Sequence, residues 1–330
     1  MQEFVVDAGS DGKSLVRVVL ARYPHLKVGQ VHKSLRKKDI RVNGVRCKTD
    51  QPVFSGDRVA VYLSDDVLAG SVDEGAGRDV ASSPYQIIYT DSKLLVVNKN
   101  TGVTVHQAGG RRKQGPFLID LLRHDLEDQQ LELCHRLDRQ TGGLLLVARQ
   151  AIISQAVREL IRQGLLLRRY RCLVRGTPIA GKTVRSADGE LFQELTAWLE
   201  KDPSRSHVYI HDEKQDGDLP IITRYRILRT FPASNPAQEE ITELEVELVT
   251  GRTHQIRAHL AHLGHPLPGD SKYGRNRYNR LFQGKEGPLK GQQLFATQLV
   301  FLPTMKGPLA YLAGRTFDIK PNYDWTGADQ

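Results

Sequence analysis

The chain has 330 residues, of which 39% are hydrophobic and 26% are charged, with 29 Gly and 15 Pro. This composition is typical of a soluble globular protein of about two domains, and it excludes the disordered and fibrous classes. No apolar run approaches the roughly 20 residues that span a bilayer, and the first residues lack the layout of a signal peptide. The three widely spaced cysteines indicate neither a disulfide framework nor a metal knuckle. We therefore expect a cytoplasmic protein with no membrane partner.

The net charge of +9 is unevenly distributed. Residues 12–63 contain 12 Lys and Arg against 3 Asp and Glu, whereas the Gly- and Ser-rich residues 64–83 contain 1 against 5. A dense positive charge favours a polyanionic partner. The pattern predicts a basic domain over residues 12–63, an acidic linker over 64–83, a larger domain over 84–320 and a short tail over 321–330.

The basic domain begins with two predicted helices. Apolar residues recur at helical spacing over residues 14–23, which Pro24 ends, and again over residues 28–38. Next come a hairpin around Asn43 and Gly44, a dipeptide favoured in type I′ turns, and a strand that ends at Val61. A solvated basic helix face would explain the charge without any partner.

This order of elements, with the phrases Ile40-Arg41-Val42-Asn43-Gly44 and Gly56-Asp57-Arg58-Val59, resembles the S4-like RNA-binding domain. In that family the second helix and the following hairpin hold structured RNA by its shape and phosphates. The resemblance implies that the basic residues of these two elements bind RNA: Lys33, Arg36, Lys37, Lys38 and Arg41.

The larger domain starts with two β-rich runs in residues 86–98, around an Asp-Ser turn, which predict a hairpin. Further along, Asp138 stands between Arg136 and Arg139, just before a Gly-Gly turn and the apolar run 144–148. A loop anchored by a buried strand is a common place for functional residues. For an isolated Asp, a surface ion pair with either arginine would be the simpler interpretation.

Residues 243–248 alternate Glu with apolar residues, which predicts a strand whose glutamates face water. The strand leads to Thr253, a candidate cap for a helix whose apolar positions Ile256, Leu260 and Leu263 precede Gly264. Arg257 falls in the first half of this helix.

Three phrases, at residues 135–143 (His-Arg-Leu-Asp-Arg-Gln-Thr-Gly-Gly), 251–257 (Gly-Arg-Thr-His-Gln-Ile-Arg) and 264–274 (Gly-His-Pro-Leu, Gly-Asp, Tyr-Gly), resemble the motifs of RluA-type pseudouridine synthases. An S4-like domain before such a body is the arrangement of members that modify large-subunit ribosomal RNA. The resemblance implies an α+β (mixed α/β) fold around a largely antiparallel sheet with a central RNA cleft. It also implies no cofactor, and ribosomal RNA or an assembling particle as the partner.

By the same resemblance, Asp138 is the carboxylate that acts on the sugar and Arg257 is its cationic partner. Tyr170 packs on the uracil, which must leave the RNA stack, and helps to remove its C5 proton. Arg136 fills the gap left by the flipped nucleotide or contacts a phosphate. The chain departs from the family pattern at Asn100 for Pro, Gly142 for Ser, Arg168 for Lys, and Leu294-Phe295-Ala296-Thr297 for a Leu-His-Ala phrase.

Other functions remain open from the sequence. Four histidines within residues 254–265 form a candidate zinc site, with hydrogen-bonded structural histidines as the alternative: His254, His259, His262 and His265. A tRNA-directed synthase or a non-catalytic ribosomal-RNA-binding assembly factor would share the basic domain. The non-catalytic protein would have no use for the pair of Asp138 and Arg257.

Overall fold

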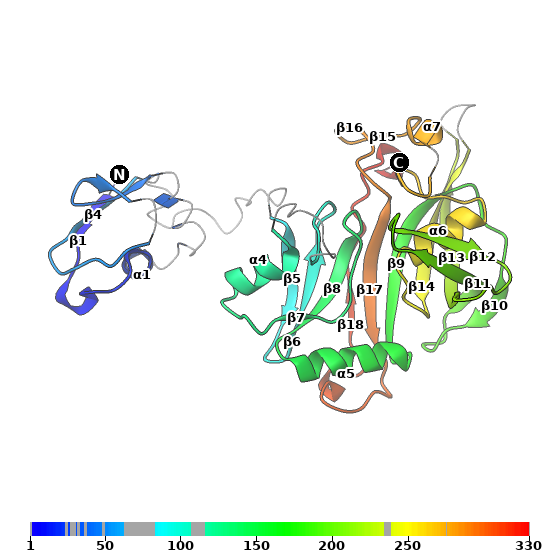
Figure 1. Ribbon diagram of the computed structural model, residues 1–330, viewed down its shortest axis with the longest axis horizontal. Helices are drawn as coiled ribbons and strands as arrows, with labels where there is room; N and C mark the ends of the chain where they lie inside the picture. The colour runs from blue at the N-terminus through cyan, green and yellow to red at the C-terminus, as the bar shows by residue number, and fades with distance from the viewer. Residues whose placement is uncertain are drawn as a thin grey trace. The chain divides into compact units, whose positions relative to one another are not determined.

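The computed structural model describes residues 2–23, 26, 31, 34–35, 38–47, 50–62, 83–106, 116–233, 239–274 and 276–329. The chain divides into two compact units, Met1–Ser82 and Ser83–Gln330, each taken here by itself (Figure 1). Among the described residues, no helix is both long and apolar enough to cross a membrane.

In the first unit, helix α1 (Leu15–Arg22) packs against a small antiparallel sheet. The helix begins where the Ser14 hydroxyl accepts a hydrogen bond from the Arg17 amide, at 3.3 Å, as expected of a helix cap. The strand order is β1-β4-β2-β3, and strand β1 lies before the predicted domain boundary at residue 12. The strands are β1 (Gln2–Val5), β2 (Ile40–Val42), β3 (Val45–Arg46) and β4 (Arg58–Val61), with a short 3-10 helix, η1 (Ala8–Ser10).

The predicted hairpin of the first unit is confirmed. Asn43 and Gly44 have φ values of 50° and 80°, as a type I′ turn requires. The Asn43 side chain also accepts a hydrogen bond from the Arg58 amide, at 2.9 Å, which ties the turn to β4. Most of the predicted helix 28–38 lies outside the described residues, including Lys33, Arg36 and Lys37, and so does nearly all of the predicted linker.

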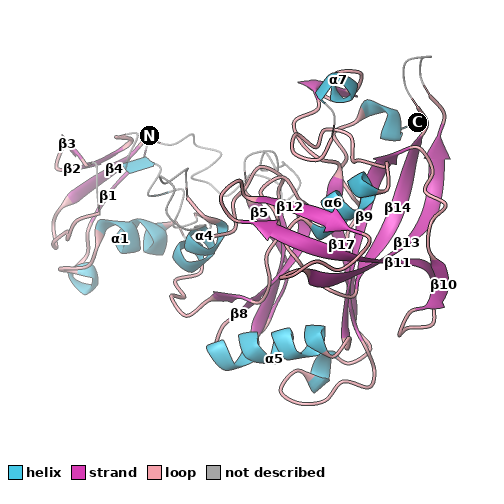
Figure 2. Ribbon diagram, turned by 45° about the vertical axis from the view of Figure 1, so that its right-hand side comes forward, coloured by secondary structure: helices cyan, strands magenta, loops and turns pink. Residues whose placement is uncertain are grey.

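The second unit is built on a 12-stranded sheet with the main order β10-β11-β13-β14-β9-β17-β8-β6-β5 (Figures 1 and 2). Its neighbouring strands run antiparallel except for the parallel pair β17 and β8, so the predicted mixed fold with a largely antiparallel sheet is confirmed. Strands β5 (Tyr85–Thr90) and β6 (Leu94–Lys99) form the predicted hairpin. The other strands are β7 (Glu132–Leu133), β8 (Gly142–Ala148), β9 (Leu166–Arg175), β10 (Lys182–Arg185), β11 (Leu191–Asp202), β12 (His207–His211), β13 (Leu219–Phe231), β14 (Ile241–Leu248), β17 (Leu294–Phe301) and β18 (Thr316–Asp318), with a separate small pair, β15 (Gln283–Gly284) and β16 (Gly287–Pro288).

Helices cover both faces of this sheet, which explains why every residue of β8 is buried. Leu144 and Leu146 pack in one core with helix α5 (Ala151–Arg162). Leu145 and Val147 point to the opposite core, which includes helices α4 (Leu118–Asp125) and α6 (Gln255–His262). Both views show α5 lying across the sheet next to β8 (Figures 1 and 2). The sequence of a strand that is covered on both faces is a continuous run of apolar residues. The remaining helices are short: α7 (Asn276–Asn279), η2 (Ala310–Leu312) and η3 (Thr326–Asp329).

Strand β14 corrects one prediction from the sequence. Its apolar residues face the core of α6 as expected, but Glu243, Glu245 and Glu247 do not face water, since each is at most 5% exposed. Their strand lies between β9 and β13: arginines of β13 stand opposite all three glutamates, and arginines of β9 stand opposite Glu245 and Glu247. Arg226 and Arg229 form ion pairs with Glu245 and Glu243. The prediction was wrong because alternation shows which residues share a face, not whether neighbouring strands cover it.

The end of the chain covers part of this charged face. Tyr323 and Trp325 are buried beyond the predicted boundary at residue 320. The Tyr323 hydroxyl donates a hydrogen bond to Glu243 Oε1 at 3.0 Å, and the Trp325 ring meets Phe231 edge to face at 5.3 Å. These contacts join the last residues to the core of the second unit.

Candidate active site

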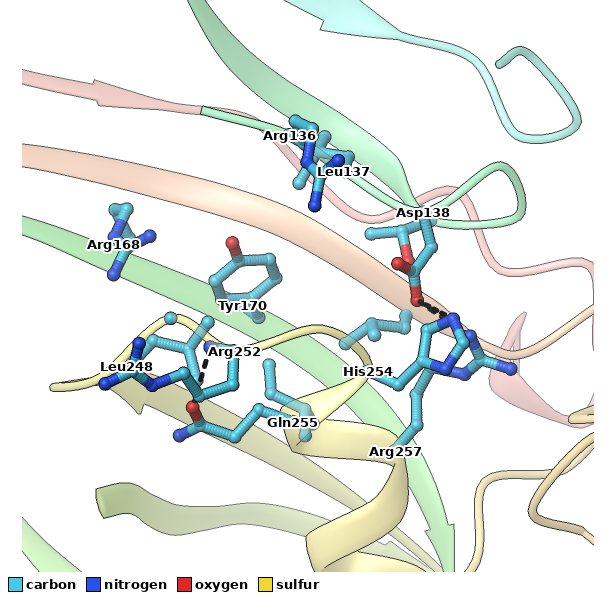
Figure 3. A pocket seen from close by; sticks show the side chains of 14 residues that line it. Arg136, Leu137, Asp138, Arg168, Tyr170, Leu248, Arg252, His254, Gln255 and Arg257 are labelled. Carbon is cyan, nitrogen blue, oxygen red and sulfur yellow. Dashed lines mark hydrogen bonds and ion pairs between the residues drawn. The ribbon is translucent and has the colours of Figure 1, made fainter. Parts of the chain in front are cut away.

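A pocket opens on the α6 face of the sheet, where the loop before β8, strand β9 and the start of α6 meet (Figure 3). The four residues that the sequence predicts for a site in the larger domain all line this pocket: Arg136, Asp138, Tyr170 and Arg257. Asp138 and Arg257 are 119 residues apart in the chain. The fold therefore brings into one pocket the residues that the resemblance had assigned to one site.

Asp138 lies on a loop that the surrounding backbone holds in place. Its carbonyl accepts a hydrogen bond from the Thr141 amide, and the Arg139 carbonyl accepts one from the Gly102 amide. The buried ammonium of Lys99 donates to the same Arg139 carbonyl at 3.2 Å and to two further carbonyls. Burial lowers the pKa of Lys99 to about 7, against the opposing influence of Asp138. The Asp138 side chain itself stays 28% exposed, so it faces the pocket.

Arg257 connects two carboxylates. Its Nη1 donates to Asp138 Oδ2 at 2.7 Å, while Nε and Nη2 donate to the two oxygens of the fully buried Asp270 at 2.7 Å and 3.0 Å. Burial alone would raise the pKa of Asp270, but the hydrogen bonds from Arg257 and from the amides of Lys272 and Tyr273 lower it. The bidentate pair fixes the guanidinium plane, so the remaining nitrogen is aimed at Asp138.

Tyr170 lies on β9, with its ring in the wall of the pocket (Figure 3). No other described residue makes a hydrogen bond with its hydroxyl. Burial raises the pKa of this hydroxyl, with Asp138 acting in the same direction and Arg168 in the opposite one. The side chain is therefore a neutral phenol near neutral pH, with an aromatic face suited to stacking on a base.

Residues 93–262 match the family model described as RNA pseudouridylate synthase. The chain is 30% identical over 268 residues to ribosomal large subunit pseudouridine synthase D of Salmonella typhimurium, covering 80% of this chain and 73% of that protein. It is also 30% identical over 285 residues to ribosomal large subunit pseudouridine synthase C of Yersinia pestis, covering 86% and 83%. This chain belongs to the RNA pseudouridylate synthase family. It is an isomerase that converts uridine to pseudouridine, and RNA is its substrate.

The start of α6 in this synthase differs from the sequence-based expectation. Thr253 does not cap the helix, because His254 occupies the cap position in the left-handed region, with φ 54°. The Gln255 side chain instead accepts a hydrogen bond from the Arg252 amide at 3.0 Å. This backbone turn brings His254 Nε2 to 3.9 Å from Asp138 Oδ2, a place in the site that sequence reasoning missed.

The four clustered histidines make separate hydrogen bonds rather than facing one point. His254 bonds the Tyr273 hydroxyl at 2.9 Å, and His259 bonds the Thr223 hydroxyl at 3.0 Å. His262 bonds Asp212, and His265 bonds the Arg175 carbonyl. Within the described ranges, no three His, Cys, Asp or Glu side chains are grouped to hold a metal ion. Burial lowers the pKa of His254 to about 4, so its imidazole is neutral beside Asp138.

Two departures from the family pattern are linked in space. A side chain at Gly142 would place its Cβ 2.7 Å from the ring of Phe295, closer than two such atoms can approach. The Phe295 ring therefore requires glycine at position 142, so the two departures explain each other. At a third departure, the Asn100 amide donates to the Pro84 carbonyl at 3.0 Å, a bond that proline could not make.

The residues predicted to contact RNA lie in different surroundings. Arg136 is exposed at the rim of the pocket, 3.2 Å from the His106 ring. Lys38 is exposed in the first unit, whereas Arg41 lies with its guanidinium over the Tyr62 ring at 4.7 Å. Sequence reasoning gave no role to Asp270, although it belongs to a recognised phrase. The contact of Asp270 with Arg257, which indicates that role, is visible only in the fold.

Proposed function

We propose that this synthase isomerises uridines of large-subunit ribosomal RNA, with Asp138 as the catalytic carboxylate. The observation that carries the proposal is the position of Asp138: partly exposed in a pocket, 2.7 Å from Arg257 and beside an aromatic wall formed by Tyr170. The curated relatives named above modify the large ribosomal subunit, which supports this RNA over tRNA. With a ribosomal substrate, we also propose a cytoplasmic location.

The reaction needs a group that can act on an electron-poor sugar carbon. The C1′–N1 bond breaks, the freed uracil turns, and C5 joins C1′ with no net oxidation and no group lost. An ionised carboxylate stabilises or traps the sugar, much as glycosidase carboxylates do. Arg257 holds the Asp138 carboxylate in position through the hydrogen bond from Nη1 to Oδ2.

The other pocket residues act on the nucleotide. Tyr170 packs on the flipped uracil, and its neutral hydroxyl hydrogen-bonds the base while the C5 proton leaves. Arg136, exposed at the rim, fills the space left in the RNA or contacts a phosphate.

We assign substrate affinity to the first unit. It is a small basic sheet-and-helix body that resembles an S4-like domain over residues 12–63, joined by a linker over 64–83 to a catalytic domain over 84–320. Its RNA-binding side chains are Lys33, Arg36, Lys37, Lys38 and Arg41. Deleting this unit should weaken RNA binding and reduce the salt dependence of the affinity.

The decisive experiment maps pseudouridines in total RNA from cells with and without the gene. The proposal expects one or a few sites in large-subunit ribosomal RNA to disappear and to return with the wild-type gene but not with Asp138→Asn. Loss of sites in tRNA alone would overturn the assigned substrate. Complementation by Asp138→Asn would overturn the assigned carboxylate, and with it the catalytic use of the pocket.

A further inference from the structure

Arg168 is a buried cation that has no partner among the residues the structure describes. Its side chain is on the sheet face that lines the pocket, and the residue is only 8% exposed. Among the described residues, no carboxylate or hydrogen-bond acceptor meets its guanidinium, and its Nε is fully buried without a partner. The next residue, Arg169, shows the usual arrangement, since it pairs with both Glu247 and Asp188. Burying an unpaired charge lowers the stability of a fold. A buried and unpaired arginine is therefore better explained by a functional role than by stability.

The guanidinium of Arg168 has a fixed place in the pocket. An added Cβ at Gly251 would lie 2.9 Å from Nη1 and 3.0 Å from Nη2, so the guanidinium lies directly against this glycine. Arg168 and Tyr170 both line the pocket from strand β9. In Figure 3, Tyr170 lies between Arg168 and Asp138. The pocket thus has the sugar-directed carboxylate at one end and an unpaired cation at the other.

We propose that Arg168 is a further catalytic residue, which donates hydrogen bonds to a carbonyl oxygen of the target uracil and stabilises the negative charge that develops there. This inference rests on the proposed function. When the C1′–N1 bond breaks, its electron pair stays with the uracil, and the charge spreads over N1, O2 and O4. The anion then bonds through C5 to C1′, water accepts the proton from C5, and water gives one proton to N1. Arg168 only donates hydrogen bonds and transfers no proton, so atoms and charge balance.

The geometry favours the base over a backbone phosphate as the ligand. Phosphates stay at the rim when a nucleotide flips, and Arg252, which lines the same pocket, is exposed there. Arg168 lies deep beside the aromatic ring on which the base packs. In a site closed off from water, a donor placed before the reaction stabilises developing charge more strongly than water does.

The first test compares Arg168→Met with Arg168→Lys and with the control Arg162→Met, which removes an arginine whose side chain is 74% exposed on α5. The substrate is deproteinised large-subunit ribosomal RNA from cells lacking the gene, assayed in single turnover. We expect Arg168→Met to slow isomerisation by about 10²-fold or more, as loss of one charge-stabilising donor does elsewhere. Arg168→Lys should keep most of the rate, and the control should equal wild type.

Stability and RNA affinity are measured on the same variants. Because Arg168 has no partner to lose, Arg168→Met should unfold at the wild-type temperature or above it. Its RNA affinity and the salt slope of binding should also stay unchanged. A clear loss of thermal stability would indicate a structural arginine, and a salt slope reduced by about 1 would indicate a phosphate contact. Either result would overturn the proposal.

A second test changes the charge of the leaving base instead of the protein. In RNA with 5-fluorouridine, the fluorine itself stabilises the uracil anion, so cleavage of the C1′–N1 bond should depend less on Arg168. On this RNA the measured rate is the loss of 5-fluorouridine, since fluorine at C5 prevents the final proton loss. We expect the effect of Arg168→Met on this rate to be smaller than its effect on uridine; an equal loss on both RNAs would overturn charge stabilisation. Gly251→Ala, which displaces the guanidinium without removing it, should reproduce the defect on uridine.

The outcome separates this inference from the proposed function. If the wild-type protein forms no pseudouridine in the ribosomal RNA, the proposed function fails. If the wild type is active and Arg168→Met reacts within threefold of it, the role of Arg168 fails and the function of the pocket stands.

Discussion

Two groups of arginines and carboxylates lie on opposite faces of the same strands, and they are built differently. On the face away from the pocket, Glu247 accepts hydrogen bonds from Arg169 and Arg224, and each of these arginines binds a second carboxylate. On the pocket face, Asp138 is partly exposed and Arg168 has no partner among the described residues. A closed network stabilises the sheet, whereas charge that is left unused is available to a substrate. Under the proposed function, the first group holds the fold and the second acts on the RNA.

The largest difference between the two groups of charges should appear with Asp138→Asn, on the pocket face. We expect the rate of isomerisation to fall by about 10³-fold or more, because loss of a catalytic group commonly has effects of this size. The substitution removes charge but almost no volume, so the free energy of unfolding and RNA affinity should change little. Single-turnover kinetics and urea unfolding on the same preparation check both. A variant with a tenth of the wild-type rate would contradict the assignment.

The matched substitution on the other face, Glu247→Gln, should have the opposite profile. Removing the Glu247 charge should cost about 2 kcal/mol of stability, because two charged hydrogen bonds weaken while each arginine keeps its second carboxylate. The rate per folded molecule should equal that of the wild type. Urea unfolding and single-turnover kinetics measure the two quantities. If Glu247→Gln slowed the reaction as strongly as Asp138→Asn, the two faces would not be functionally distinct.

As the pH falls, we expect protonation of buried histidines to lower the stability of the fold before either group of ion pairs is affected. Burial lowers the pKa of His259 to about 4, whereas in the unfolded chain its pKa is near 6.5. The unfolded state therefore binds more protons as the pH falls from 6.5 to 4, and stability falls over that range. The share due to His259 is roughly 3 kcal/mol by pH 4. His259→Gln should lose less stability than wild type between pH 7 and pH 4, measured by urea unfolding; parallel curves would contradict this.

Tyr170 separates stacking from hydrogen bonding within the pocket. Tyr170→Leu should weaken placement of the flipped base by roughly 1–3 kcal/mol, the range found for base stacking on aromatic rings. Tyr170→Phe keeps the ring and should keep RNA binding, with slower product formation after the C1′–N1 bond has broken. RNA with deuterium at uracil C5 tests this through an isotope effect in the Phe variant. A Phe variant as fast as wild type would leave Tyr170 a stacking platform alone.

The smallest effect is expected for Gly142 and Phe295, whose contacts connect the two faces of the sheet. Gly142→Ser places atoms against the Phe295 ring and should cost about 1–3 kcal/mol of stability. Phe295 also packs on Tyr323, which bonds Glu243, so the strain should reach the charged face. The double variant with Phe295→His should recover part of the loss. Additive effects in the double-mutant cycle would show that the two positions are not coupled.

Much of the fold and part of the site were predictable from the sequence. Turn dipeptides and local periodicity identified the hairpin at Asn43 and Gly44, helix α1 and strand β14. The short phrases identified the family, and they predicted Asp138, Tyr170 and Arg257 for one site, which the structure brings into one pocket. These features depend on residues close together in the chain, and local patterns carry such information directly.

Other features were decided by tertiary structure alone. The glutamates of β14 are buried because arginines from β9 and β13 meet them, and Glu247 is 78 residues from Arg169 in the chain. The packing of distant segments also decides that Asp270 holds Arg257 and that Arg168 meets no partner in the described part of the chain. An amino-acid sequence determines which residues can carry charge and which share a face of a strand. Whether a charge is paired depends on which distant segments pack beside it, and that is decided only when the sheet is complete.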